Sequence, residues 1–113
     1  MEKKALSDSM VYQEERFTKK ILFQKGDSVA FVLNFLPGQQ LPSHTHPGAE
    51  VYIQALKGNG TIQVNESEYE LFEGEIIHLS GEETFSYRNS GDHPSSLHVV
   101  LCKIPSPAYT KEI

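Results

Sequence analysis

The residues best suited to do chemistry in this 113-residue chain lie within residues 38–50. His44 and His46 are two positions apart, so on an extended strand both imidazoles face the same side. Pro47-Gly48 favours a turn, and Glu50 begins the next apolar run. Two neutral imidazoles and a carboxylate form a 2-His-1-carboxylate set, which leaves open positions on a divalent metal. The pattern therefore predicts a metal site of His44, His46 and Glu50.

The residue types alone decide neither whether a metal is bound nor which metal it would be. The same stretch is compatible with a polar loop that carries two solvated histidines, because His-X-His is common by chance. Imidazole and carboxylate ligands also suit several divalent transition metals, namely Zn, Ni, Fe, Mn or Co. The residue types alone select none of these.

The segments that must position these side chains alternate with the period of β-strands. Residues 28–36 are apolar on both faces, which indicates a strand covered on both sides, with a second subunit as one source of the outer cover. Glu50 and Tyr52 share one face of the next strand, so Tyr52 lines the pocket if Glu50 points inward. About eight strands are predicted after an N-terminal arm at 1–16: 17–24, 28–36, 51–56, 61–64, 69–72, 75–79, 84–88 and 97–104. This pattern predicts an antiparallel barrel or jelly roll, without distinguishing either from a sandwich.

The spacing of Gly38, His44, His46 and Glu50 resembles the first sequence motif of the cupin superfamily. That motif continues to a glycine after six residues, whereas Gly58 follows Glu50 after seven, so we expect a bulge or a longer strand. A second motif begins at a glycine and ends at an asparagine, which Gly74 and Asn89 match. Within it, Ser80, Glu82 and Phe85 stand where the family has proline, glycine and the fourth metal-binding histidine.

This resemblance covers roughly residues 28–105 and implies an all-β, single-domain jelly-roll barrel of the cupin type, at 17–113. It implies a pocket that holds a divalent metal, with His78 or His98 as candidates to replace the missing ligand. The more common role of a lone strand histidine is packing or solvation. Because cupins include dioxygenases, isomerases, decarboxylases, sensors and binders, the resemblance does not specify a reaction.

Aromatic residues are the second group of candidate site residues. Phe85 is expected to face the pocket in place of the family histidine, and Tyr87 shares its face of the strand. With Tyr52 they predict a largely apolar cavity for a small organic ligand. The alternative is that these rings simply fill a small barrel.

Composition restricts the classes of partner. The net charge is −5 and no stretch concentrates Lys and Arg, which argues against nucleic acid. No apolar run is long enough to span a bilayer, and the first residues do not resemble a signal peptide. Cys102 is the single cysteine, which fits a reducing compartment, with the cytoplasm as the default.

Three functional hypotheses follow. The first is a small cupin, of unspecified role, that binds a divalent metal, a small organic ligand or both, as a homodimer. The second is a metal-dependent enzyme of the dioxygenase or isomerase type that uses His44, His46 and Glu50. The third is a metal-free structural barrel. No catalytic residue is specified by the sequence.

Overall fold

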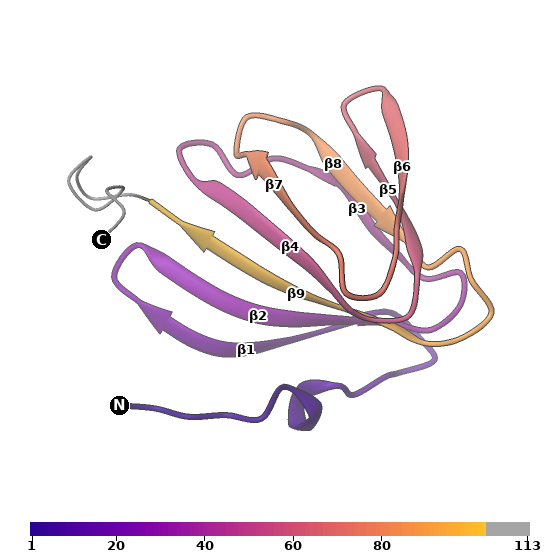
Figure 1. Ribbon diagram of the computed structural model, residues 1–113, viewed down its shortest axis with the longest axis horizontal. Coiled ribbons are helices and arrows are strands. Elements are labelled where there is room, and N and C mark those ends of the chain that lie inside the picture. The colour runs from indigo at the N-terminus through magenta and orange to yellow at the C-terminus, as the bar shows by residue number, and fades with distance from the viewer. Residues whose placement is uncertain (104–113) are drawn as a thin grey trace.

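The computed structural model describes residues 1–103, which form nine β-strands and one short 3₁₀ turn at Leu6–Ser9 (Figure 1). The part of the predicted 17–113 domain beyond Lys103 lies outside the described residues. The strands are β1 (Thr18–Lys25), β2 (Ser28–Phe35), β3 (Gln40–His44), β4 (Glu50–Lys57), β5 (Gly60–Val64), β6 (Ser67–Leu71), β7 (Ile76–Ser80), β8 (Phe85–Arg88) and β9 (Ser95–Cys102).

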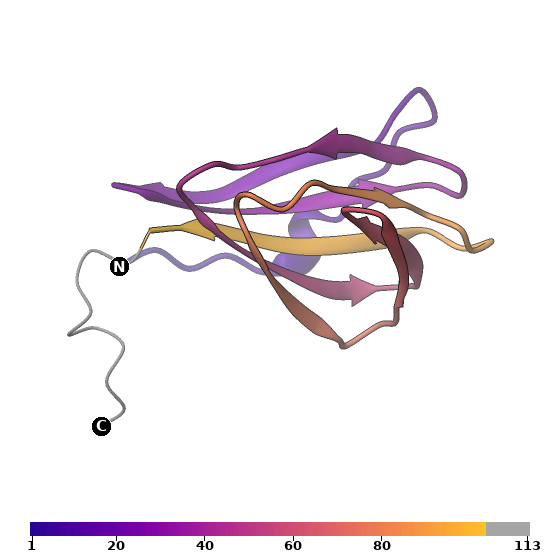
Figure 2. The same ribbon diagram turned by 90° about the horizontal axis from the view of Figure 1, so that it is seen from above.

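These strands form two antiparallel sheets. The five-stranded sheet has the order β1-β2-β9-β4-β7, and the four-stranded sheet has the order β3-β8-β5-β6. Figure 2 shows the strands curving around a common interior, which confirms the predicted all-β jelly-roll barrel. Closure is incomplete, because β1 and β7 are the edges of one sheet and β3 and β6 are the edges of the other. We call the two openings between these edges the β1–β3 seam and the β6–β7 seam.

Strand β3 is the element that the sequence pattern did not predict. It is largely polar and contains Pro42, which lacks the N–H that a central strand needs but is tolerated in an edge strand. Its pairing with β8 shifts register between Leu41 and His44, so that His44 lies opposite Phe85. This irregular strand carries the first histidine to the barrel interior.

The core is formed by the inward side chains of both sheets. On β4 these are Val51, Ile53 and Ala55, each at most 2% exposed. Burying a valine or isoleucine side chain contributes about 1.5–3 kcal/mol. The alternation therefore fixes which face of β4 points inward. The other buried core residues are Phe31, Leu33, Phe35, Ile62, Leu71, Leu79, Phe85, Tyr87, Leu97 and Val99.

The N-terminal arm packs against the five-stranded sheet and is held by a buried polar network. The Asn34 side-chain amide donates to the Ser9 carbonyl at 2.7 Å and accepts from the Ser96 hydroxyl at 2.7 Å. The hydroxyls of Tyr12 and Ser96 lie 2.6 Å apart. Asn34 and Ser96 are completely buried, and buried polar groups of this kind stabilise the fold only when they are paired.

The arm also corrects one expectation about residues 28–36. Val32 is fully buried although it lies outside the core cluster, on the face of β2 that also carries Asn34. Figure 1 shows the arm running alongside β1, next to this strand. The outer cover at these positions is therefore supplied by the arm of the same chain, and no second subunit is required there.

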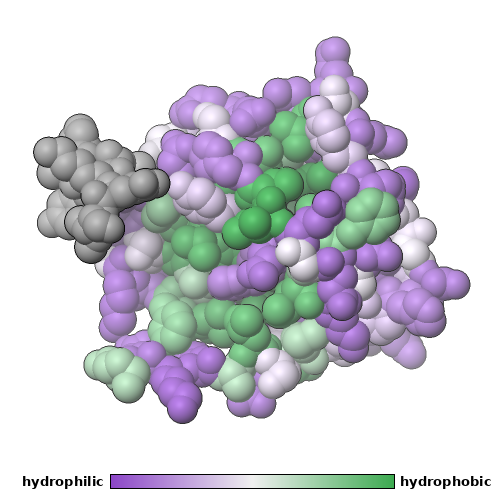
Figure 3. All heavy atoms as spheres, viewed as in Figure 1, coloured by the Kyte–Doolittle hydropathy of each residue, from purple (hydrophilic) through white to green (hydrophobic). Residues whose placement is uncertain are grey.

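Two surface properties bear on partners. Figure 3 shows hydrophobic side chains near the middle of the displayed face, over strands of the five-stranded sheet, with hydrophilic side chains around them. Within residues 1–103 no helix has the length and apolar character needed to cross a membrane.

Candidate functional site

A pocket of about 250 Å³ lies at the β1–β3 seam, between the two sheets. Most of its wall is hydrocarbon, and three basic side chains interrupt it: Lys19, His44 and His46. Among the described residues that line it, none is acidic. The remaining lining residues are Phe17, Phe31, Leu33, Leu41, Phe85 and Val99. The barrel is therefore not completely filled, and its free space resembles the apolar cavities that bind small organic molecules.

The two histidines converge in this pocket as predicted. Their ring centroids are 4.8 Å apart, with the rings edge-on at 85°. His44 Nδ1 lies 2.7 Å from the Pro42 carbonyl oxygen, which can only accept, so Nδ1 carries the proton and neutral His44 presents Nε2 as an acceptor. The backbone N–H of His46 donates to the Gly81 carbonyl at 2.8 Å, which fixes this part of the chain after β3 ends.

Phe85 lies beside both histidines, in the pocket wall. Its ring centroid is 4.4 Å from that of His44 and 6.0 Å from that of His46, and the residue is 4% exposed. The register of β3 on β8 causes this contact, because His44 is opposite Phe85. Packing of the two ring types gives this end of the pocket a largely aromatic wall.

The structure corrects the predicted placement of Glu50. Its Oε1 lies 2.6 Å from His78 Nε2, whereas the next residue, Val51, is completely buried in the core. Because successive side chains of a strand face opposite sides, Glu50 points to the outer face when Val51 points inward. The structure thus brings two of the three predicted metal ligands together and leaves the third outside.

The sequence already contained a signal that Glu50 is one residue away from the inward position. Seven residues separate Glu50 from Gly58, and six separate Val51 from Gly58. The family spacing of six therefore counts back to Val51, which occupies the inward position where a carboxylate was expected. The expected bulge is present, between Ala55 and Lys57 in the pairing of β4 with β9, but it lies downstream and leaves Glu50 outside.

The two tyrosines that were predicted to line the pocket lie elsewhere. Tyr52 is on the outer face with Glu50, where its ring centroid is 5.1 Å from that of His78. Tyr87 is in the core, and its hydroxyl donates to Ser95 Oγ at 3.0 Å. Burial raises the pKa of Tyr87, so this hydroxyl remains protonated at neutral pH. A Cβ at Gly60 would overlap the Tyr87 hydroxyl, so this glycine is required by close packing.

The candidate replacement ligands are also outside the pocket. His78 is exposed and paired with Glu50, and His98 alternates with the buried residues Leu97 and Val99. Cys102 has the same parity as His98 on β9. None of these three lines the pocket at the β1–β3 seam.

The remaining donors do not fit the metal that the resemblance implied. Protein sites that hold zinc, iron or similar ions supply at least three ligand side chains. Here two imidazoles are present with the phenyl ring of Phe85 beside them, and the inward residue of β4 next to Glu50 is the buried hydrocarbon Val51. Among the described residues, no group of three or more His, Cys, Asp or Glu side chains is arranged to hold a metal ion. We therefore assign no metal-dependent step.

The electrostatics of the pocket favour an anion. Burial lowers the pKa of His46, and the neighbouring His44 and Lys19 lower it further. Lys19 reaches over the pocket, with its Nζ 4.3 Å from the Phe31 ring centroid, which is a cation–π contact. Sequence reasoning missed Lys19, although it shares with Phe17 one face of an extended strand and could have been found by period-2 counting.

Comparison with known proteins agrees with this architecture. The family model described as "Cupin domain" matches residues 31–101. Auxin-binding protein 1 of Arabidopsis thaliana is 26% identical over 87 residues, which is 69% of this chain and 43% of that protein. The chain thus spans less than half the length of this curated relative.

Solved structures show the same fold. The TT1209 protein of Thermus thermophilus superposes with a TM-score of 0.86 and 30% identity, covering 93% of this chain and 100% of that one. A Klebsiella pneumoniae protein with a double-stranded beta-helix domain gives a TM-score of 0.84 at 19% identity, with 90% of each chain covered. The family match extends over most of the chain and includes every pocket residue except Phe17 and Lys19. The chain belongs to the cupin family.

Proposed function

We propose that this protein is a cupin that binds a compact, largely apolar organic carboxylate in the pocket at the β1–β3 seam, without requiring a metal. The observation that carries the proposal is the composition of the pocket wall. Six apolar side chains surround the space, and three basic groups enter it with no acidic residue among the described lining residues. Such a wall offers hydrophobic burial to a hydrocarbon body and charge-assisted hydrogen bonds to a carboxylate.

The size of the pocket restricts the ligand. Its volume of about 250 Å³ is below the roughly 300–1,000 Å³ of typical drug-sized sites, so we expect one or two rings or a short branched chain. The ring of Phe85 and the imidazole of His44 favour an aromatic body, which would stack against them. The name of the Arabidopsis relative says that it binds auxin, which supports a small-molecule role for this barrel.

Each basic group has a distinct role in this proposal. Lys19, at the rim, attracts the carboxylate and neutralises its charge. His44 and His46 donate hydrogen bonds to the carboxylate in their protonated forms. Burial, and then the positive neighbours His44 and Lys19, lower the pKa of His46, so a bound anion that offsets the neighbours raises it and binding is accompanied by proton uptake.

Calorimetric titration with arylacetates tests the proposal. Phenylacetate or naphthylacetate should bind in the presence of excess chelator, and more tightly than 2-phenylethanol or its naphthyl equivalent. Affinity should rise from pH 8 to pH 6. The Lys19→Met variant should bind about fivefold more weakly, a change of about 1 kcal/mol, whereas Lys20→Met, at the neighbouring exposed position of β1, should bind normally. Equal affinity for acid and alcohol, or binding abolished by chelator, would contradict a metal-independent carboxylate site.

We further propose that the protein forms a homodimer through the uncovered part of the five-stranded sheet. Tyr52, His98 and Val100 are half-buried on this face, and Ile76 is 64% exposed beside them. An exposed isoleucine next to other apolar side chains favours association. The single cysteine is consistent with action in a reducing compartment such as the cytoplasm.

Light scattering after size exclusion tests the dimer. The protein should have a mass near twice 12.7 kDa at micromolar concentrations, and Ile76→Glu should reduce it to the monomer mass. Ile21→Glu is the matched control, because Ile21 is 52% exposed on edge strand β1, away from this face. Identical masses for the two variants would exclude this face as the interface.

A further inference from the structure

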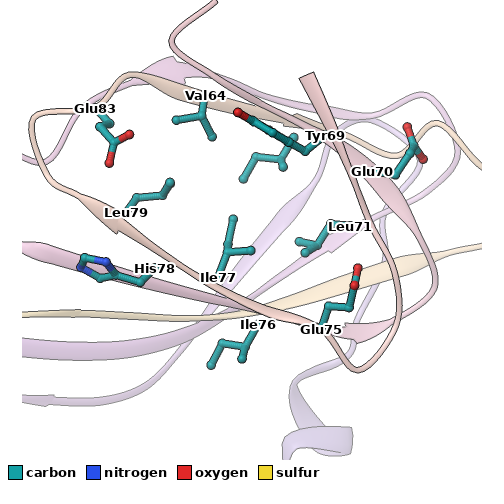
Figure 4. Close-up of a pocket in the computed structure, with 11 residues that line it drawn as sticks. Val64, Tyr69, Glu70, Leu71, Glu75, Ile76, Ile77, His78, Leu79 and Glu83 are labelled. Atoms are coloured by element: carbon teal, nitrogen blue, oxygen red, sulfur yellow. The ribbon is translucent and has the colours of Figure 1, made fainter. Parts of the chain in front are cut away.

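A second hollow, of about 380 Å³, lies at the β6–β7 seam on the other side of the core (Figure 4). Its walls come from β5, β6 and β7, none of which contributes to the pocket at the β1–β3 seam. We call it the β6–β7 groove. The two hollows therefore use different strands of one barrel, and the groove has its own chemistry.

The middle of the groove is apolar. Figure 4 shows Ile77 and Leu79 of β7 pointing into it, opposite Leu71 and the ring of Tyr69. Tyr69 is 56% exposed although its ring borders this hydrocarbon surface. The alternation of β7 explains the arrangement, because Ile76 and His78 point to the opposite side of the strand. Ile62 and Val64 of β5 complete the wall.

Each end of the groove carries a carboxylate that is held by backbone. Glu75 Oε1 accepts from the N–H of Phe72 at 2.8 Å, just before β7 begins. Glu83 Oε1 accepts from the N–H of Ser80 at 2.9 Å, where β7 ends. Glu75 and Glu83 thus lie at opposite ends of β7, and a strand of five residues is about 16 Å long.

A third lining carboxylate, Glu70, accepts from the Thr61 hydroxyl at 2.7 Å. Within the described part of the chain, none of the residues that line the groove is Lys or Arg, and the lining histidine, His78, pairs with Glu50.

We propose that the β6–β7 groove binds an elongated organic dication, an aliphatic diamine whose ammonium groups reach Glu75 and Glu83. Its methylene chain packs on Ile77, Leu79 and Leu71, and the Tyr69 ring offers its face to a nearby ammonium. Each carboxylate keeps a second oxygen for an ammonium N–H while the first holds the backbone. The net charge of −5 raises the local concentration of cations.

A homologous ligand series measures both parts of this recognition. Backbone amide NMR spectra of the full chain are recorded during titration with 1,6-diaminohexane, 1,8-diaminooctane and 1,10-diaminodecane. Shifts should concentrate at Tyr69, Ile77 and Leu79, and affinity should rise about fourfold per buried methylene until both carboxylates are reached. Octylamine should bind at least about fivefold more weakly than the eight-carbon diamine, and 1,8-octanediol should give no saturable shifts.

Three variants separate the groove from general acidity of the surface. Glu75→Gln and Glu83→Gln keep an oxygen for the backbone N–H and remove the charge, so each should lower the affinity for the diamine to that for octylamine. Glu73→Gln is the control, because the Glu73 carboxylate accepts from the Gly58 N–H in a neighbouring turn and does not line the groove. Diamine affinity lowered equally by all three changes would overturn the proposal. Equal binding of diamine and diol would also overturn it. So would amide shifts that depend on protein concentration alone, since such shifts mark the groove as a contact between two copies of the chain.

Discussion

At the scale of single residues, hydrocarbon side chains stand at two positions where metal donors were expected. Val51 takes the inward position on β4 where a carboxylate was expected, and Phe85 takes the position of a histidine on β8. Each substitution removes a metal donor and adds apolar surface to the core or the pocket wall. Neither side chain can supply a metal ligand, and Phe85 adds hydrocarbon to the pocket wall.

Restoring one donor tests this account. Phe85→His places a third imidazole beside His44 and His46, so Zn²⁺ affinity should increase at least about a hundredfold, because each ligand supplies about 3 kcal/mol of the roughly 10–16 kcal/mol of a four-ligand site. Calorimetric titration with Zn²⁺ at pH 7.5 measures the gain. Phe85→Leu removes the ring without adding a donor and should bind no better than the parent chain. Equal affinities in all three proteins would show that the two imidazoles do not converge on this position.

The titration of two histidines gives a pH dependence of stability. Burial lowers the pKa of His98, and burial with positive neighbours lowers that of His46, both from about 6.5. The unfolded chain therefore takes up protons before the folded chain as the pH falls below about 7. The free energy of unfolding should decrease from there until the folded-state pKa values are reached.

Urea unfolding at pH 7.5, 6.5 and 5.5 measures this loss. His98→Gln and His46→Gln should each reduce the dependence on pH relative to the parent chain. Stability that rises on acidification in this range would contradict the direction of both shifts.

At the scale of elements, the pocket depends on how one turn is held. The Pro47-Gly48 turn that follows β3 is pinned by Gly81, whose carbonyl accepts from the His46 N–H and whose N–H donates to the Ala49 carbonyl at 2.9 Å. The second motif of the family was expected to have its glycine at position 82, where this chain has Glu82. The glycine needed for close backbone approach is present one residue earlier.

Gly81→Ala tests this role. A Cβ there would overlap the His46 carbonyl oxygen, which is backbone and cannot move without displacing the turn. We expect a loss of at least about 2 kcal/mol in the free energy of unfolding and a weaker carboxylate site. Gly91→Ala is the control, because its Cβ would meet its nearest atom at 3.6 Å, an ordinary contact. Similar unfolding midpoints for both variants would contradict the pinning role of Gly81.

At the scale of the whole molecule, alternation in the sequence was sufficient to predict an antiparallel all-β fold, and the resemblance to cupins was needed to choose the jelly-roll barrel. Strands β2, β4 and β9 were recognisable because their inward residues are apolar at every second position. Strand β3 was not, since its residues are mostly polar and its pairing is short. The sequence also did not predict that the arm covers the outer face of β2, because its contacts with Asn34 and Ser96 join residues far apart in the chain.

The site was predictable in part for the same reason. The spacing of His44 and His46 predicted that they face the same side, and both line the pocket, although His46 lies beyond β3 and is held by the Gly81 carbonyl. Glu50 was misplaced because an offset of one residue transfers a side chain to the opposite face of a strand. Period-2 counting puts Lys19 on the same face as Phe17, but that this face of β1 borders the pocket depends on the pairing of β1 with β2.

The buried network around Asn34 also has a consequence for biosynthesis. Tyr12 pairs with Ser96, which is synthesised 84 residues later. Strand β9 is also the partner that joins β2 to β4, so neither the contacts of the arm nor the larger sheet can be completed before β9 has been made. Until then the earlier strands of this sheet keep unpaired edges, which is the interval in which a nascent chain is most prone to association.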